Sequence, residues 1–158
     1  MAVDMFLKLD GIQGESLDAK HPNEIEVVSY SWGVTNTGSA VSSRRGKPHE
    51  ASLNVVVTTS KATPSLFLHC CTGSHIKTGV ITARKAGDAP LDFLHINMTD
   101  IVISSYQTGG HGGGDIPMET VGLTFAKVAV VYTAQSAAGG ALQNYSAAFN
   151  FLTDRKIT

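Results

Sequence analysis

One segment of the sequence carries two histidines and two cysteines within seven positions, a combination of side chains that binds zinc in many proteins. It reads HCCTGSH, from His69 to His75. Zinc sites usually leave about two to four residues between their cysteines, and adjacent residues of a helix point about 100° apart. The adjacent Cys70 and Cys71 therefore favour another role, as small apolar side chains that pack a helix against a sheet. The sequence predicts no metal site and no cofactor.

A glycine-rich segment suggests a second kind of chemistry, the binding of phosphate. It reads TGGHGGGD, from Thr108 to Asp115. A P-loop needs a lysine and then a serine or threonine after its last glycine, because the lysine reaches the phosphates. Here Asp115 follows Gly114, and its charge repels phosphate. The glycine spacing of a dinucleotide-binding turn is also absent, and no helical pattern follows. We therefore expect a loop in which His111 is solvated.

The sequence contains no recognisable catalytic group. No G-x-S-x-G segment presents a serine nucleophile, and nothing around the two cysteines indicates an activated thiolate. The carboxylates are scattered through expected strands and turns, so that no acid–base pair stands out. We predict that the protein is not an enzyme and works by contact with other molecules.

The one basic cluster of the sequence consists of Arg44, Arg45 and Lys47. It lies in residues 35–50, which are polar, rich in turn-forming residues and without helical or strand periodicity. Loops of this length in a compact domain are usually functional or disordered. The cluster is thus either the solvated tip of a long exposed loop or a docking point for an acidic patch on another chain.

Most of the chain has the pattern of strands. Residues 120–125 alternate between apolar and polar or small side chains, which is typical of a half-buried strand. In another run, Val28, Tyr30 and Trp32 are expected to share one face, and Gly139-Gly140 marks a turn before the last strand. The expected strands cover residues 5–9, 25–34, 53–59, 76–85, 91–98, 101–106, 120–132 and 145–152.

A single segment, about residues 63–73, has the signals of a helix. Thr63 suits the N-cap, Pro64 the first helical position and Gly73 the position just past the end. The spacing of apolar residues predicts one apolar face made of Leu66, Phe67, Cys70 and Cys71. About eight strands with one short helix indicate an all-β fold, either a single β-barrel or two packed antiparallel sheets, with the helix covering an opening.

Length and composition restrict the functional classes. A chain of 158 residues suffices for one domain, residues 1–158, with a substantial core. The formal net charge of −1 favours neither nucleic acid nor a membrane surface as partner. The N-terminus lacks the apolar stretch of a signal peptide, and no later stretch is long and apolar enough to span a bilayer. The neighbouring cysteines form no disulfide framework, which indicates folding in the cytoplasm.

Several segments in order along the chain strongly resemble the haemolysin-coregulated protein family. The resemblance spans almost the whole sequence and is more specific than any single motif. The segments are DMFLKLDGIQGES (4–16), EIEVVSYSWG (24–33), ATPSLF (62–67), RKAG (84–87) and ETVGLTFAKVAVVYTAQ (119–135).

The resemblance implies a structural role in bacterial type VI secretion. Members form six-membered rings that stack into an inner tube, and a contracting sheath expels this tube and its spike. The ring lumen carries or chaperones some effectors, and the tube protein reaches the extracellular space or target cell without a cleaved signal peptide. Some relatives carry a C-terminal effector domain, which we do not expect here.

The long loop is the candidate site that the resemblance suggests. Its place in the family implies contact with the adjacent ring, and the residues expected to take part are Ser42, Ser43, Arg44, Arg45 and Lys47. The chief alternative is a monomeric barrel that binds a small ligand, in which the apolar strands would line a cavity.

Overall fold

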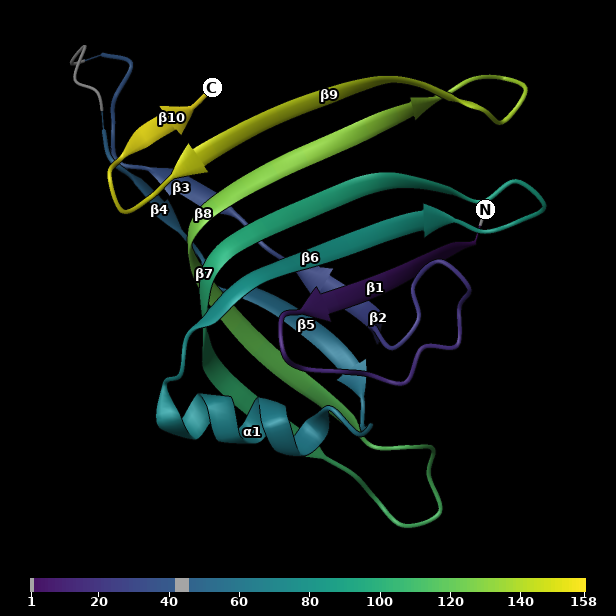
Figure 1. The fold of residues 1–158 in the computed structure, drawn as a ribbon. Helices are drawn as coiled ribbons and strands as arrows, with labels where there is room; N and C mark the ends of the chain where they lie inside the picture. The colour runs from purple at the N-terminus through teal and green to yellow at the C-terminus, as the bar shows by residue number, and fades with distance from the viewer. Residues whose placement is uncertain (1, 42–45) are drawn as a thin grey trace.

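Ten strands and one helix make up the part of the chain that the structure describes, residues 2–41 and 46–158 (Figure 1). The structure is a computed structural model. Its elements confirm the predicted all-β class with one short helix. They are β1 (Val3–Leu9), β2 (Ile25–Ser31), β3 (Val34–Asn36), β4 (Pro48–Glu50), β5 (Leu53–Thr58), α1 (Thr63–Thr72), β6 (Ile76–Lys85), β7 (Leu91–Gly109), β8 (Met118–Gln135), β9 (Ala141–Asn150) and β10 (Arg155–Ile157).

Six of these strands close into an antiparallel barrel. The order runs β8–β5–β2–β1–β6–β7, and pairing of β7 with β8 completes the ring. Closure pairs the edges that an open sheet would leave exposed. The predicted β-barrel is therefore confirmed. Helix α1 packs against β7 at one end of the barrel (Figure 1).

The long strands β7 and β8 extend beyond the barrel. On one side β8 pairs with β5 through Met118–Leu123 and then with β9 through Lys127–Gln135. The expectation of separate strands at 91–98 and 101–106 was wrong, because β7 is continuous. Asp100 has a positive φ of 57°, but pairing with β8 resumes at Ile101.

Alternating side chains fill the interior of the barrel. In β5, Leu53, Val55 and Val57 are buried while the residues between them are half-buried. Burying each such aliphatic side chain contributes about 1.5–3 kcal/mol. Inward-facing residues of β8, such as Leu123, complete the same cluster. The apolar runs of the sequence thus form a packed core.

The helix ends where predicted but starts one residue earlier. The N-cap is Ala62, which makes no capping side-chain bond, and Thr63 is the first helical residue. The Thr63 hydroxyl instead donates a hydrogen bond to Glu119 Oε2 at 2.8 Å. At the other end Gly73 adopts the left-handed conformation with φ 66°, as predicted for the residue past the end.

The predicted apolar face of the helix is partly wrong. Leu66 is fully buried and Cys70 packs against the core. Phe67 is 54% exposed and Cys71 is exposed. The ring of Phe67 meets the edge of Tyr106 at the surface, with centroids 6.1 Å apart.

Two strand predictions also needed correction. Strand β2 ends at Ser31. Val27 is buried and Val28 is 48% exposed, and after a register shift between Val27 and Ser29 it is Tyr30 and then Trp32 that pack on the core. Such an irregularity breaks period-two alternation, so Val28 does not share the face of Trp32, which packs on the core. The last predicted strand, 145–152, is β9, which begins at Ala141 after a turn whose Gly139 has φ 91°. The glycine-rich segment is a loop from Gly110 onward, as expected, whereas Thr108 and Gly109 end β7.

Candidate assembly surfaces

The long loop of the sequence contains a two-stranded hairpin that projects from the barrel, here called the arm (residues 34–50; Figure 1). Strands β3 and β4 pair from Val34–Glu50 to Asn36–Pro48. Backbone and hydroxyl groups of Thr37 and Lys47 continue the pairing, with the Lys47 N–H donating to Thr37 Oγ1 at 3.1 Å. The expectation of a loop without strand structure was therefore wrong at its base.

Of the predicted stacking residues, the structure describes Lys47 alone. Ser42, Ser43, Arg44 and Arg45 fall outside the described residues. Lys47 is exposed and directly precedes the first residue of β4. Val41, an apolar residue of the arm, is 96% exposed. The role of these residues in stacking remains a prediction.

The base of the arm is fixed to the barrel. Glu50 Oε1 accepts a hydrogen bond from the Phe125 N–H of β8 at 3.4 Å, and burial raises the pKa of the Glu50 carboxyl. The Ala51 N–H donates to the Gly33 carbonyl at 2.9 Å. Trp32 packs on Phe125 with ring centroids 5.7 Å apart. The arm is therefore held at its root, and its direction relative to the barrel is defined.

A largely apolar groove of about 550 Å³ lies beside the root of the arm. It separates the arm from β8, β9 and β10. The side chains that line it are those of Trp32, Val34, Asn36, Pro48, Val128, Val130, Ala147, Ala148, Phe149, Phe151 and Lys156. Because β9 and β10 lie outside the six-stranded barrel, this groove is a surface feature rather than a barrel interior.

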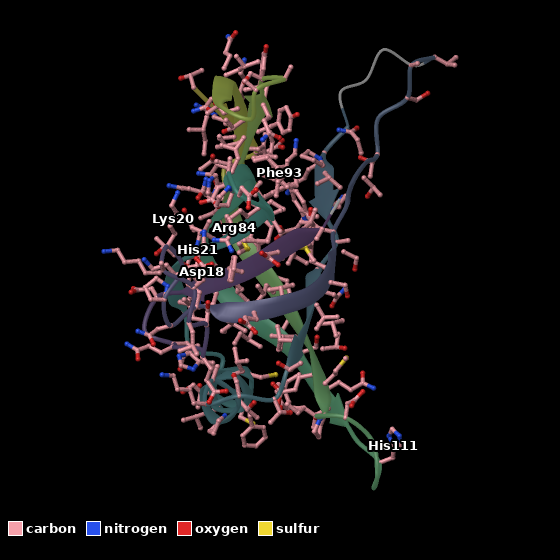
Figure 2. All side chains as sticks on the ribbon, turned by 90° about the vertical axis from the view of Figure 1, so that its right-hand side faces the viewer. Asp18, Lys20, His21, Arg84, Phe93 and His111 are labelled. Atoms are coloured by element: carbon pink, nitrogen blue, oxygen red, sulfur yellow. The ribbon has the colours of Figure 1, made fainter. Side chains whose placement is uncertain are left out.

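On the other side of the molecule, Arg84 of β6 organises a cluster of carboxylates (Figure 2). Its guanidinium donates two hydrogen bonds to Asp18, at 2.8 and 2.6 Å, and a third to Asp4 at 3.2 Å. The bonds from Arg84, helped by the backbone N–H of Lys20, hold the pKa of Asp18 well below its usual range. The guanidinium also lies 5.1 Å from the ring centre of Phe6.

His21 reinforces this cluster. It is 7% exposed and stacks on Phe6 with ring centroids 4.5 Å apart. Its Nδ1 lies 2.8 Å from Glu24 Oε2, and its Nε2 lies 3.2 Å from both oxygens of Asp92 in β7. Together Arg84 and His21 fasten the segment between β1 and β2 to strands β6 and β7.

Strands β1 and β2 separate toward the start of β1. Strand β1 pairs with β6 from Val3 to Leu9, whereas its pairs with β2 are Phe6–Glu26 and Leu7–Ile25. A hollow of about 450 Å³ lies beside this opening, here called the β1–β2 groove. Its lining residues are Val3, Asp4, Met5, Phe6, Leu17, Asp18, Glu26, Val27, Val28, Thr58 and Arg84.

The His-Cys segment does not converge on one point. His69 Nδ1 donates to the Ser65 carbonyl at 2.8 Å, and His75 Nδ1 donates to Asp100 at 2.6 Å. Cys70 packs inward and Cys71 faces outward. Among residues 2–41 and 46–158, no three histidine, cysteine, aspartate or glutamate side chains are placed to hold a metal ion.

The two cysteines are expected to respond differently to substitution. Cys71→Ser should change the free energy of unfolding by less than about 0.5 kcal/mol, because the side chain is exposed. Cys70→Ser should lower it by about 1 kcal/mol, because a hydroxyl replaces a thiol against the core. Urea unfolding of both variants measures this. Equal effects would contradict the assignment of an inner and an outer cysteine.

Comparison with known proteins identifies the family. The protein family described as "Type VI secretion system effector, Hcp" matches residues 6–132. The chain belongs to the Hcp family. It is 39% identical over 143 residues to protein hcp1 of Pseudomonas aeruginosa, a match that covers 88% of each chain. The resemblance to the haemolysin-coregulated protein family is thereby confirmed.

Solved structures share the fold over almost the whole chain. The crystal structure of Hcp1 from Salmonella typhimurium has a TM-score of 0.82 and 36% identity, and the match covers 99% of this chain and 100% of that one. A structure described as a type six secretion system protein has a TM-score of 0.92 at 28% identity, with the same coverage. The protein is thus a type VI secretion protein with the Hcp barrel. No helix in the described part of the chain is long and apolar enough to cross a membrane.

Proposed function

We propose that this protein is the tube subunit of a type VI secretion machine. Six copies form a ring, and rings stack into the inner tube that sheath contraction expels. The observation that supports stacking best is the arm, which is fixed at its base through Glu50 and carries an exposed Val41 and Lys47. Ordering a projecting hairpin costs conformational entropy, and contact with a neighbouring ring would offset that cost.

The role we propose is structural rather than catalytic. The partners are further copies of the chain, the spike and sheath of the machine, and effectors carried in the ring lumen. The whole chain serves as a single tube-protein domain, made in the bacterial cytoplasm and exported with the tube without a cleaved signal peptide. A ring is a heterologous assembly in which one side of each subunit meets the opposite side of the next.

The small-ligand-binding barrel has less support. Leu53, Val55, Val121 and Leu123 are each 0% exposed and fill the space where a barrel ligand would lie. The apolar hollow of about 550 Å³ is instead a groove beside the arm. An open groove of this kind suits a protein contact better than the enclosed pocket of a small molecule.

Size-exclusion chromatography with light scattering tests the ring. We expect a mass six times that of the monomer, and ring-shaped particles with a central opening by electron microscopy. The ring should persist at moderate salt, because we expect strands rather than surface ion pairs to build the subunit interface. A monomer at micromolar concentration would rule out the tube role.

A further inference from the structure

The function proposed for the chain leaves the glycine-rich loop between β7 and β8, residues 110–117, without a role. We propose that this loop docks into the apolar groove of about 550 Å³ on a copy in the next ring. The inference rests on the proposed stacking of rings and names two surfaces that meet there. It follows from the position, the chemical character and the charge of the loop and the groove.

The loop and the groove lie at opposite ends of the molecule. In Figure 1 the loop between β7 and β8 is at the bottom, whereas β10 and the arm, which border the groove, are at the upper left. In Figure 2 His111 of the loop marks the lower end, and the arm is at the upper right. In a head-to-tail stack a projection at one end of a copy meets a surface at the opposite end of the next. The loop and the groove satisfy this requirement.

The loop is held in a defined shape. The Pro117 carbonyl accepts hydrogen bonds from the Thr59 N–H at 2.9 Å and from the Thr59 hydroxyl at 3.0 Å. Inside the loop, Gly114 lies so close to the ring of His111 that a Cβ at this position would collide with it. A segment that is ordered before it meets a partner lowers the cost of ordering on association.

The end of the loop presents apolar side chains to the solvent. Ile116 is 65% exposed, and Met118, the first residue of β8, is 47% exposed. Pro117 lies between them and is exposed as well. Apolar side chains that gather on a surface mark protein contacts, so this end of the loop is suited to enter an apolar groove.

The groove offers a matching surface. Most of its lining is apolar and includes Val130, Phe149 and Phe151. The indole N–H of Trp32, which also lines the groove, is buried and has no hydrogen-bond partner among the described residues. Buried donors in proteins are nearly always paired. A glycine-rich backbone can approach a partner closely and supplies carbonyl groups that accept such a hydrogen bond.

Charge favours the same pairing. With histidine neutral, Asp115 is the one charged residue in the sequence of the loop. Among the described residues that line the groove, Lys156 alone is charged. Arg155 and Lys47, which are close to the lining residues in sequence, are exposed and basic as well. An acidic loop that meets a basic rim orients the two copies and favours one register over another.

An exchange of the charge pair tests the docking. Asp115→Lys and Lys156→Glu should each leave rings of normal mass. Each should reduce the number of tubes in electron micrographs by more than about tenfold, because the lost contact repeats around the ring. The variant that carries both changes should recover tubes, since it restores opposite charges and the wild-type formal net charge of −1. Asp88→Lys and Lys77→Glu are the matched controls, at exposed residues outside the loop and the groove, and they should form tubes.

The apolar part of the contact has its own test. Ile116→Ser should leave rings intact and reduce the number of tubes, because the side chain that enters the groove is lost. Leu142→Ser is the matched control, since Leu142 is 61% exposed on β9 and does not line the groove. This control should form tubes in normal number.

Cysteine crosslinking shows which copies meet. In a Cys71→Ser background, which removes the exposed natural thiol, Ile116→Cys with Ala147→Cys places one thiol on the loop and one in the groove. Oxidation of tubes should give a ladder that continues beyond six chains, because a heterologous contact between rings extends along the tube. Either new cysteine alone should give dimers at most.

Several outcomes would overturn the proposed docking. They are a ladder that stops at six chains, which would place the contact within one ring, no crosslinks in intact tubes, and failure of the Asp115→Lys/Lys156→Glu variant to recover tubes while its rings are intact. Loss of tubes in the controls would also count against it. A wild-type protein that forms no rings would instead refute the proposed function.

Discussion

Replacing Glu119 with alanine is expected to lower the free energy of unfolding by about 3 kcal/mol. Glu119 is 1% exposed, and its Oε2 accepts hydrogen bonds from the Tyr106 hydroxyl at 2.7 Å and the Thr63 hydroxyl at 2.8 Å. Each partner left unpaired in the interior costs about 1–3 kcal/mol. The variant also removes the buried Oε1, which has no hydrogen-bond partner and is itself unfavourable. The loss of stability should therefore be smaller than the sum of the costs of the two unpaired hydroxyls. Thermal unfolding should begin roughly 10 °C lower.

Glu119→Gln is the matched control. It keeps the shape of the side chain and one acceptor oxygen for Tyr106 and Thr63, so it should lose less than half as much stability as the alanine variant. The difference between the two variants gives the combined contribution of the acceptor oxygen and the side-chain volume that glutamine keeps and alanine loses. If both variants were as stable as the wild type, Glu119 would not be the link between helix α1 and strands β7 and β8.

The pKa of Tyr106 provides a second test of its hydrogen bond to Glu119. Burial, and then the hydrogen bond to Glu119, raise the pKa of Tyr106 to about 12. Because this lies above the ordinary value near 10, the neutral phenol stabilises the fold fully below about pH 10, and that contribution is lost as the pH rises through 12. In Glu119→Ala the ultraviolet absorbance of tyrosinate from Tyr106 should appear at lower pH. An unchanged titration would mean that burial alone sets this pKa.

The sequence predicted the barrel strands well wherever one face is buried. In β5 the buried residues Leu53, Val55 and Val57 alternate with half-buried ones, and the start of β8 follows the same rule. The pattern is visible in the sequence because burial on one side forces period two. The left-handed position of Gly73 was predictable for a similar local reason, since glycine has no Cβ to oppose a positive φ.

Other elements depend on pairing that no local pattern reveals. Asp100 has φ 57° inside β7, yet the strand continues because β8 pairs on both sides of it. The short β3 and β4 have polar residues at most positions, and their pairing from Val34–Glu50 is held by the contact of Glu50 with β8. The sequence of residues 35–50 alone therefore predicts neither the pairing of β3 with β4 nor the contact of Glu50 with β8.

The two candidate surfaces also differ in how clearly the sequence shows them. The basic cluster stood out because its charges are adjacent in sequence. The β1–β2 groove did not, because Arg84 is 66 residues from Asp18 and His21 is 71 residues from Asp92. The barrel brings these partners together. Their sequence signal is limited to the segment RKAG, which the family resemblance includes.

Reversing the charge of the arm should separate ring formation from tube formation. Arg44→Glu with Arg45→Glu is expected to leave single rings of normal mass and to abolish stacked tubes and secretion at moderate salt. Individual surface ion pairs contribute less than about 1 kcal/mol. Their repetition around a sixfold ring multiplies the effect, so that a small change in each subunit decides whether rings stack.

Lys61→Glu with Lys77→Glu is the control for this variant, since both lysines are exposed away from the arm and the change in net charge is the same. This control should form tubes. Raising the salt concentration should also reduce the number of wild-type tubes, because salt screens the attraction between exposed charges. Normal tubes from Arg44→Glu/Arg45→Glu would show that stacking does not depend on the arm charges. If that variant ran as a monomer, the arm would belong to the ring interface instead, since loss of a contact between rings cannot dissociate the subunits within one.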